Sequence, residues 1–293
     1  MKEIQGNNLN RLVLRLADRS IFSKKKIETV IIPVVQKILE SQQTGKTIIV
    51  GIQGGQGTGK TATAKLINKS LTQLGYKVQS FSLDDFYTSD KARHQLRKKY
   101  PHNPYYQISR GMPGTHRIAL LKSVLKKLKA GQNVNLPIFD KSLGVNAHGD
   151  ISKRTVKVKG RQDFILFEGW CLGMPVVSSE EFLRICNRNR IAVKKIDPSL
   201  KHHQVVFKFT NDYQPIWKYF DSLIMMKAKS SRLHRSWRNK QEKELKKKTG
   251  RGMTQKEIKN FVAPYLPFTY VCYEKVKPAI KIIVGYRHKF KLG

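Results

Sequence analysis

The segment that decides the fold is Gly54-Gly55-Gln56-Gly57-Thr58-Gly59-Lys60-Thr61, which follows an apolar run at 47–52 and precedes a helical pattern at 62–74. It has the G-x-x-x-x-G-K-T spacing of a phosphate-binding loop, in the strand–loop–helix context that such a loop requires. Glycines let the backbone fold around phosphates where a Cβ would intrude, and the following helix N-terminus favours anions. Lys60 is expected to reach the β- and γ-phosphates, and the Thr61 hydroxyl to bind Mg²⁺. The sequence therefore predicts a protein that binds a nucleoside triphosphate.

Composition bounds the class of protein. The chain has 293 residues, of which 40% are hydrophobic, so it can bury the core of one large domain. Its three cysteines, Cys171, Cys186 and Cys272, lack metal-ligand or disulfide spacing and fit a reducing compartment. Charges interrupt the N-terminal leucines, and the sequence contains no run of 18 apolar residues. We therefore expect a soluble cytoplasmic protein with no membrane partner.

The net charge of +37 is unusually large and attracts polyanions. One interpretation is RNA or DNA binding; the other is a lysine-rich surface that also attracts anionic small substrates. Basic residues are spread along the whole chain, without a recognisable motif for reading RNA or DNA. We therefore expect no specific nucleic-acid partner, and the sequence indicates no particular oligomeric state.

Short apolar segments alternate with helical patterns, which predicts a parallel sheet covered by helices on both faces. The expected strands are 47–53, 77–83, 134–139, 163–168, 222–227 and 279–285. Residues 1–45 are expected to be a helical segment packed on the core, with Pro33 starting or kinking its second helix. Residues 46–293 are expected to form the main domain. The predicted fold is α/β, a P-loop NTPase with a mainly parallel sheet flanked by helices.

A strongly basic segment lies near the C-terminal end of the chain. Residues 227–259 hold 13 lysines and arginines against three acids, with few strand-forming residues. We expect a mobile, basic helical lid over the nucleotide at approximately 228–260. The alternative is a solvated basic face with no part in catalysis.

Acidic residues follow two of the expected strands. Asp84 and Asp85 follow the second strand, and phosphoryl transfer to an alcohol needs a carboxylate that accepts the hydroxyl proton. Neighbouring side chains on a strand point in opposite directions, so Asp84 is expected to be the base and Asp85 structural. An acidic pair of this kind is otherwise a helix cap or turn. Glu168 ends an apolar strand and is expected to hold Mg²⁺ together with Thr61 and Asp84; its alternative is a surface glutamate.

Two polar loops supply candidate acceptor contacts. The first is Arg110-Gly111-Met112-Pro113-Gly114-Thr115-His116, and the second is Phe139-Asp140-Lys141-Ser142. A histidine or lysine in a loop usually lies on the surface, but here both loops lie near expected strand or helix ends. The expected acceptor-binding residues are Asp85, Tyr87, His116, Asp140 and Lys141.

The order of motifs resembles that of the P-loop D-glycerate 3-kinase family, within the wider group of phosphoribulokinases, uridine kinases and pantothenate kinases. The resemblance extends from about Ile48 to about Pro267. It is carried by GIQGGQGTGKT (51–61), SLDDFY (82–87), RGMPGTH (110–116), FDKS (139–142), LFEGWCLG (166–173), YQPIWKYFD (213–221), the pair Trp237-Arg238 and GMTQKEIKNFVAPYLP (252–267).

The resemblance implies that ATP phosphates bind at 54–61, with Lys60 as the transition-state cation and Mg²⁺ at Thr61. It further implies that Asp84 is the general base, that Glu168 holds metal or acceptor, and that Arg238 clamps the transferring phosphoryl group. Lid closure would exclude water and suppress ATP hydrolysis. The implied reaction is the ATP-dependent phosphorylation of a small, anionic hydroxyl compound, D-glycerate to 3-phosphoglycerate.

Three positions depart from the family pattern. Arg117 stands where the family has an acid, Ile151 where it has an arginine, and Asn239-Lys240 follow the lid arginine in place of Leu-Gln. If the missing arginine binds the acceptor carboxylate, Arg117 or Arg154 would have to replace it. The alternatives are the same chemistry on a nucleoside, pantothenate or sugar phosphate, and a non-catalytic nucleotide-binding protein associated with RNA.

Overall fold

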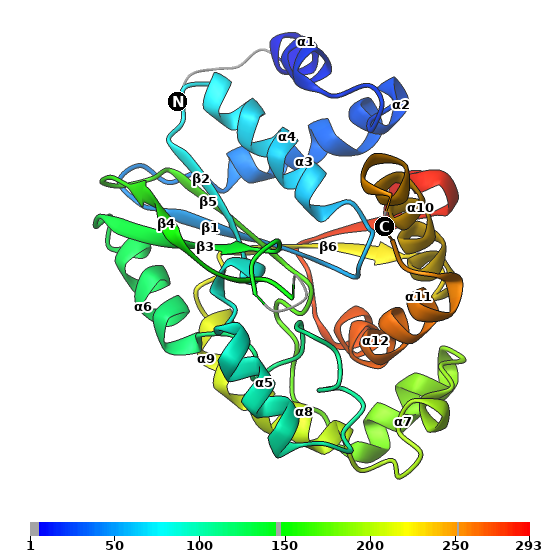
Figure 1. Cartoon of the computed structure of the whole chain (residues 1–293). Coiled ribbons are helices and arrows are strands. Elements are labelled where there is room, and N and C mark those ends of the chain that lie inside the picture. The colour runs from blue at the N-terminus through cyan, green and yellow to red at the C-terminus, as the bar shows by residue number, and fades with distance from the viewer. Residues whose placement is uncertain (1–5, 145–147, 251) are drawn as a thin grey trace.

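A six-stranded sheet in the order β2-β5-β1-β6-β7-β8 forms the centre of the molecule (Figure 1). The structure is a computed structural model that describes residues 6–144, 148–250 and 252–293. All neighbouring strands run parallel except β8, which is antiparallel to β7. Their bounds are β1 Ile48–Gly54, β2 Val78–Ser82, β5 Phe164–Gly169, β6 Ser222–Ala228, β7 Ile280–Val284 and β8 Phe290–Leu292.

The six strands expected from the sequence all form, and each observed end lies within one residue of the expected end. However, β3 (Val134–Asp140) does not join the central sheet. It pairs antiparallel with β4 (Asp150–Val158) in a separate two-stranded sheet. The apolar-run criterion missed β4 because most of its residues are polar and exposed, and it also missed the short strand β8. The mainly parallel α/β fold is confirmed, with one strand outside the central sheet.

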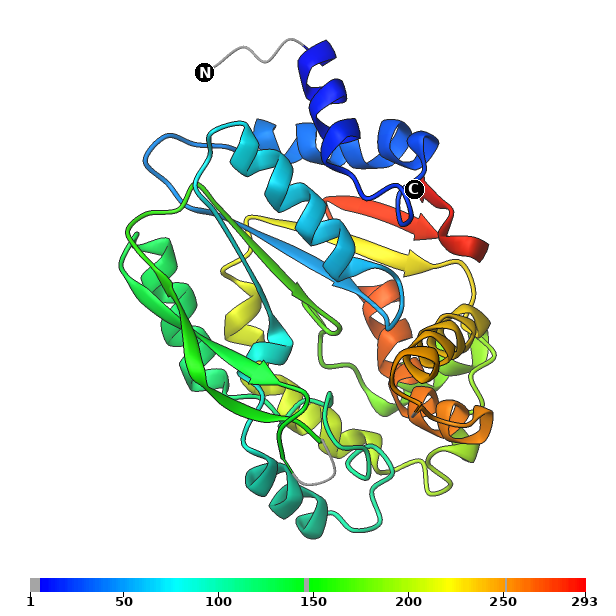
Figure 2. The same cartoon turned by 45° about the horizontal axis from the view of Figure 1, so that its top comes forward.

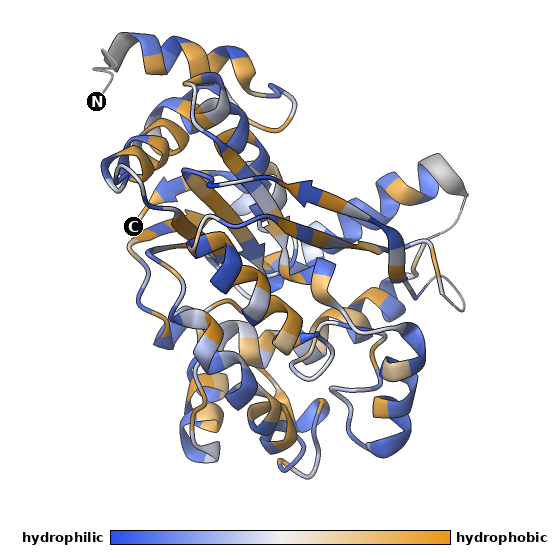
Figure 3. Cartoon of the chain, turned by 90° about the vertical axis from the view of Figure 1, so that its left-hand side faces the viewer, coloured by the Kyte–Doolittle hydropathy of each residue, from blue (hydrophilic) through white to orange (hydrophobic). Residues whose placement is uncertain are grey.

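Helices cover both faces of the central sheet (Figure 2). The helices α1, α3 and α4 lie on one face, and α6, α9 and α12 lie on the other. Figure 3 shows the apolar residues concentrated on the central strands, while the helices alternate apolar and polar faces. β1 and most of β5 are buried, as expected of parallel strands covered on both sides. The bounds of these helices are α4 Lys60–Gln73, α6 Ile118–Lys129, α9 Gln214–Trp217 and α12 Leu266–Lys275, and the further helices α5, α7 and α8 span Asp90–Lys99, Ser179–Arg188 and His203–Thr210.

The N-terminal segment is helical and packs on this core. It consists of α1 (Gly6–Leu16), α2 (Lys24–Lys26), a π-helical turn at Ile27–Ile31 and α3 (Ile32–Glu40). Buried side chains such as Val13 and Val30 join the hydrophobic core. Pro33 is the second residue of α3, and the chain is already helical from Lys24 through the π-helical turn, so Pro33 lies where π-helical hydrogen bonding changes to α-helical. Residues 1–5 of the expected segment lie outside the described residues.

The expected lid segment contains two helices, α10 (Arg232–Thr249) and α11 (Gln255–Val262). Gly250 ends α10 with φ 71°, and a capping box between Thr254 and Glu257 starts α11. Glu242 Oε2 accepts a 2.9 Å hydrogen bond from Met253 N, which ties the two helices together. Residue 251 of this segment lies outside the described residues. Within the part of the chain that is described, no helix has the length and apolarity needed to cross a bilayer.

Candidate active site

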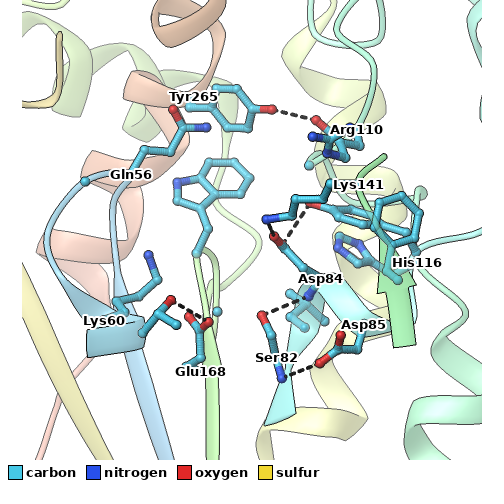
Figure 4. A pocket seen from close by; sticks show the side chains of 18 of the residues that line it. Gln56, Lys60, Ser82, Asp84, Asp85, Arg110, His116, Lys141, Glu168 and Tyr265 are labelled. Atoms are coloured by element: carbon cyan, nitrogen blue, oxygen red, sulfur yellow. Dashed lines mark hydrogen bonds and ion pairs between the residues drawn. The ribbon is translucent and has the colours of Figure 1, made fainter. Parts of the chain in front are cut away.

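The candidate site lies where three strand ends meet. Because the sheet order places β5 between β2 and β1, their carboxyl ends are neighbours, and Ser82 of β2 pairs with Glu168 of β5. Ligands of open α/β sheets bind outside such strand ends. A cavity of about 400 Å³ opens at this point (Figure 4). Its charged lining residues are Lys60, Arg110, Lys141, Arg238, Asp84, Asp85 and Glu168.

The phosphate-binding loop forms one wall of this cavity. Gly57 and Gly59 have φ of 76° and 96°, a conformation that favours glycine, and α4 begins directly afterwards at Lys60. Thr58 Oγ1 donates to Gly55 O at 2.8 Å, and Lys60 Nζ donates to the same oxygen at 3.2 Å. Burial lowers the pKa of Lys60, while the carboxylates of Glu168 and Asp84 oppose this shift. Gln56, Gly57, Lys60 and Thr61 line the cavity itself, whereas Gly54, Gly55, Thr58 and Gly59 complete the loop behind it.

Helix α10 packs against the back of this loop. His234 Nδ1 donates to Gln56 O at 2.8 Å, and burial lowers the pKa of this histidine to about 4, so it is neutral at pH 7. A Cβ added at Gly57 would lie 2.7 Å from the Cβ of Trp237. The glycine therefore serves both the turn of the loop and the close approach of α10.

Oxygen ligands gather beside Lys60. Thr61 Oγ1 donates to Glu168 Oε1 at 3.0 Å, and the carboxylate of Asp84 lies across the cavity (Figure 4). No three His, Cys, Asp or Glu side chains in the described ranges are close enough to hold a metal by themselves. This donor set fits Mg²⁺, which takes one or two protein oxygens together with phosphate oxygens and water. When bound there, Mg²⁺ would neutralise charge on the β- and γ-phosphates.

The acidic pair lies in a 3₁₀ turn at Leu83–Phe86, not on a strand. Ser82 Oγ accepts from Asp84 N at 3.2 Å, and Asp85 Oδ2 accepts from Ser82 N at 2.9 Å. The two residues were expected to point in opposite directions because they would lie on a strand. That reason was wrong, since they lie in a turn. Capping separates them instead, because Asp85 closes the turn and leaves Asp84 free to point across the cavity. Burial raises the pKa of Asp85, and its backbone hydrogen bonds oppose this shift.

Two side chains hold the carboxylate of Asp84: Tyr87, which ends the same turn, and Lys141, from the loop after β3. Tyr87 donates its hydroxyl to Oδ1 at 3.0 Å, and Lys141 Nζ lies 3.1 Å from Oδ2. Burial by itself would raise the pKa of Asp84, but the Lys141 ammonium and the Tyr87 hydroxyl hold it below its usual value. Asp84 is therefore ionised at neutral pH, as a proton acceptor must be.

His116 supports this arrangement from behind. Its ring stacks on Tyr87 with 4.4 Å between centroids, and its Nδ1 lies 2.7 Å from the Tyr213 hydroxyl. Burial lowers the pKa of His116 to about 3. The ring is therefore neutral at pH 7 and contributes shape and hydrogen bonding to the site, without a charge for an acidic acceptor.

Several cationic and acidic side chains lie elsewhere than the sequence led us to expect. Asp140 does not line the cavity; its carboxylate accepts from the backbone N and hydroxyl of Ser142. Arg117 donates to Asp85 O at 3.3 Å outside the cavity, and Arg154 lies on the exposed strand β4. Neither side chain lines the cavity, whereas Arg110 does.

Arg110 lines the cavity beside Lys141, and sequence reasoning assigned it no role although the RGMPGTH motif begins with it. Its carbonyl accepts from the Tyr265 hydroxyl, 2.5 Å away, and its guanidinium lies 5.8 Å from the Phe139 ring centroid. Tyr265, Phe261 and Gln241 also line the cavity without having been assigned a role. Phe261 and Tyr265 lie in the segment 252–267, which is one of the motifs that carry the family resemblance. That membership was the sequence signal that could have identified them.

Arg238 reaches the same cavity from α10. Its Nη2 lies 2.5 Å from Glu242 Oε1, and its guanidinium lies 4.8 Å from the ring centroid of Phe261 on α11. Glu242 is buried and, as described above, also holds Met253. The expected lid arginine is thus oriented by both lid helices.

Comparison with known proteins agrees with this geometry. Residues 49–174 match the model of the phosphoribulokinase/uridine kinase family. The uncharacterized kinase mug58 of Schizosaccharomyces pombe is 34% identical over 250 residues, 83% of this chain and 88% of that protein. The chain belongs to this kinase family. As a P-loop kinase, it uses ATP with Mg²⁺ and transfers a phosphoryl group to an alcohol.

Two further proteins that are similar to this kinase are named as D-glycerate 3-kinases. Chloroplastic D-glycerate 3-kinase of Arabidopsis thaliana is 30% identical to this chain, and the match covers 75% of this chain and 46% of the Arabidopsis protein. The solved structure of D-glycerate 3-kinase from Cryptococcus neoformans has a TM-score of 0.76 and 25% identity, with 97% of each chain covered. The resemblance inferred from the motifs is confirmed.

Proposed function

We propose that this kinase transfers the γ-phosphoryl group of ATP to D-glycerate and forms 3-phosphoglycerate. The observation that carries the proposal is an ionised Asp84, paired with Lys141 and sharing the cavity with the cation Arg110, across from Lys60. A small hydroxy acid needs a base at its hydroxyl and cations at its carboxylate. The likeness to D-glycerate 3-kinases over nearly the whole chain supports the same acceptor.

The chemistry assigned to these residues is an in-line transfer. The acceptor hydroxyl oxygen attacks the γ-phosphorus, the bond to the bridging oxygen of ADP breaks, and the hydroxyl proton passes to Asp84. Lys60 stabilises the charge on the transferring group, and Arg238 approaches it from α10. Thr61 and Glu168 supply the protein oxygens for Mg²⁺. Tyr87 and Lys141 keep Asp84 oriented and ionised before the transfer.

Arg110 and Lys141 are the residues to which we assign the acceptor carboxylate. An arginine binds a carboxylate through two parallel N–H groups, whereas lysine acts as a point charge. Lys141 already pairs with Asp84, so a neutral nucleoside would leave Arg110 without an anionic partner in the cavity. This charge arrangement supports an anionic acceptor over uridine.

We further assign residues 228–260 the role of a lid, in a main domain of residues 46–293. Arg238 and Gln241 of α10 and Phe261 of α11 line the cavity, which supports a water-excluding role for these helices. All three cysteines are free and buried, which is consistent with the cytoplasmic location we propose.

The function is tested by ADP release from ATP and Mg²⁺ with D-glycerate, L-glycerate, uridine, pantothenate and ribulose 5-phosphate in turn. We expect strong stimulation by D-glycerate alone. Equal stimulation by another member of the panel, or none by D-glycerate while ATP still binds, would contradict the proposed acceptor.

Substitutions test the assigned roles in the same assay. Lys60→Ala should remove nearly all turnover, because no other cation stands in the phosphate loop. Asp84→Asn should lower kcat by about 10²–10⁴-fold, the usual contribution of a general base, while the Kd for ATP changes little. An Asp84→Asn enzyme with unchanged kcat would rule out the assigned base.

For the acceptor carboxylate, Arg110→Ala should raise the KM for D-glycerate by about tenfold or more, the loss of one charge-assisted contact. Arg117→Ala is the matched control, because Arg117 lies outside the cavity, and its KM should stay close to that of the wild type. Equal changes in the two variants would show that Arg110 does not contact the acceptor.

A further inference from the structure

A second cavity, of about 740 Å³, lies on the outer side of the lid helices. It is bounded by α10, by α11 and the turn that follows it, and by the segment 190–196 after α7. Figure 1 shows α10 and α11 together at the edge of the molecule, with α7 beyond them. Its fifteen lining residues include none that lines the active-site cavity.

The charge of this cavity is entirely positive. Five of its lining residues are basic and none is acidic; the basic residues are Arg190, Lys195, Arg232, Arg235 and Lys259. Among the described residues, none of these five forms an ion pair. By contrast, Arg238 and Lys240 on the same helix pair with Glu242 and Glu244. All five side chains are exposed, and no acidic residue of the lining offsets the repulsion between their like charges.

Two of the five cations lie where a helix disfavours them. Arg232 and Arg235 occupy the first turn of α10, which contains no acidic residue. The macrodipole places partial positive charge at this end of a helix, so cations here lower its stability. A bound anion would relieve both this effect and the mutual repulsion.

The floor of the cavity is apolar. Ile191 and Val262 are buried with exposed fractions of 6% and 3%, and Leu266 lies beside them. Ser231, Ser236, Asn239 and Asn260 add hydrogen-bonding groups at the rim. An apolar floor under a basic, polar rim suits a small molecule with an apolar body and a phosphate group.

The elements around this cavity also form the active site. On α10, Arg235 and Asn239 face the second cavity, and Arg238 faces the first. On α11, Asn260 lines the second cavity and its neighbour Phe261 lines the active-site cavity. A ligand that joins α10 and the residues after α11 to the segment 190–196 would therefore hold Arg238 over the active site.

We propose that this cavity binds a small phosphate monoester and that the bound ligand fastens the lid helices to the body of the kinase. The phosphate contacts Arg232, Arg235 and Lys259, and the apolar body of the ligand lies on Ile191 and Val262. The site is separate from the nucleotide and acceptor positions.

Phenyl phosphate is a suitable probe, because it combines a dianion with an apolar ring. The full chain is first titrated with a non-hydrolysable ATP analogue and Mg²⁺, which reports ATP binding separately and fills the phosphate loop. Phenyl phosphate is then added in a calorimeter at 0.15 M salt, where exposed charges are screened beyond about 8 Å. Inorganic phosphate and phenol are titrated in parallel.

Two double variants remove the same number of charges from the same two helices. Arg235→Ala with Lys259→Ala should weaken phenyl phosphate binding by about tenfold or more. Lys243→Ala with Lys256→Ala is the control, because both lysines are exposed and line neither cavity, and it should leave the Kd within about twofold of the wild type. Lys141→Met, in the active-site cavity, should also leave it unchanged.

The proposal is supported if phenyl phosphate binds more tightly than inorganic phosphate and phenol, and if only the first double variant loses it. Equal weakening in both double variants would reduce the effect to bulk charge and overturn the site. Loss of binding in Lys141→Met would show that phenyl phosphate binds in the active site and would overturn the second site. If single-stranded RNA binds here and phenyl phosphate does not, the cavity is a nucleic-acid contact and the proposed ligand class is wrong.

Discussion

At the scale of single residues, the site depends on how Asp84 is kept ionised. Its carboxylate is 38% exposed and is held by Tyr87 and by Lys141, which comes from the loop after β3. The neutral ring of His116 stacks on Tyr87 and fixes its orientation. The base is thus positioned by three side chains from two loops and one turn. Its ionisation depends chiefly on one of them, Lys141.

We predict that Lys141→Met shifts the acid limb of the kcat profile to higher pH. The Lys141 ammonium lowers the pKa of Asp84, so its removal lets burial raise that pKa, and a larger fraction of the base is protonated in mildly acidic solution. The kcat ratio of variant to wild type should therefore fall as the pH decreases from 8 to 5. A ratio that is constant over this range would show that Lys141 does not tune the base.

At the scale of secondary-structure elements, the loop 54–61 and α10 form one packed unit. Tyr273 of α12 also accepts from Gly55 N at 3.0 Å, and its hydroxyl donates to Met226 O of β6 at 3.2 Å. The phosphate loop is therefore fixed from behind by two helices and a strand. The hairpin β3–β4 contributes differently, because it stands outside the sheet and brings Lys141 to the cavity from the opposite side.

We predict that Gly57→Ala weakens ATP binding by about tenfold or more and lowers the free energy of unfolding by about 2 kcal/mol. The new Cβ would lie 2.7 Å from Trp237 Cβ, at a φ of +76°. Gly45→Ala is a matched control, since Gly45 has a φ of +75° with no atom within 4 Å of the added Cβ. It should show only the backbone cost of about 1 kcal/mol and normal ATP affinity. Calorimetry measures the affinity for ATP, and urea unfolding measures the free energy of unfolding.

At the scale of the whole molecule, charge and acid sensitivity are the main physical properties. The net charge of +37 comes from 57 basic and 20 acidic residues, so only a minority of cations can find an acidic partner. In addition, two of the three buried histidines among the described residues, His116 and His234, are neutral at pH 7 in the folded state. Protonation of either one in place would add a buried cation to an already basic protein.

We predict that binding to single-stranded RNA falls steeply with salt and is negligible near 0.15 M. A fitted slope of log K against log salt would then describe counterion release alone. Filter binding with two unrelated RNA sequences measures this, and the two sequences should behave alike. Sequence-selective binding that persists at 0.15 M salt would favour the RNA-associated alternative.

We predict that the free energy of unfolding decreases as the pH falls below 6.5. Burial lowers the pKa of His116 to about 3 and that of His234 to about 4, so between these values and 6.5 the unfolded chain binds more protons. Each histidine then contributes a loss of up to about 1.4 kcal/mol per pH unit. Urea unfolding at pH 8, 6.5 and 5 measures the slope. His116→Asn should be less stable at pH 8 but show a shallower slope, and an unchanged slope would exclude this histidine as a source.

The acceptor side of the site shows where sequence reasoning reached its limit. Asp84, Lys141 and the phosphate loop were expected at the cavity and lie there. Asp140 has an equally suggestive position in the sequence, yet its carboxylate folds back on Ser142. Arg117 was a candidate for the missing arginine, but Arg110 lines the cavity. One residue of difference along a loop reverses the direction of a side chain, and the sequence pattern does not specify the path of a loop.

The sequence by itself determined the phosphate loop, the positions of five of the six strands in the central sheet and the kinase family. These features depend on spacing, glycine content and apolar runs within a few consecutive residues, where local physical chemistry is sufficient. Only the tertiary structure decided that β3 lies outside the central sheet, that Arg110 and Tyr265 line the same cavity as Asp84, and that a second basic cavity lies behind the lid. Those features arise from contacts between segments far apart in the chain, and such contacts depend on sheet order and loop paths that no local pattern encodes.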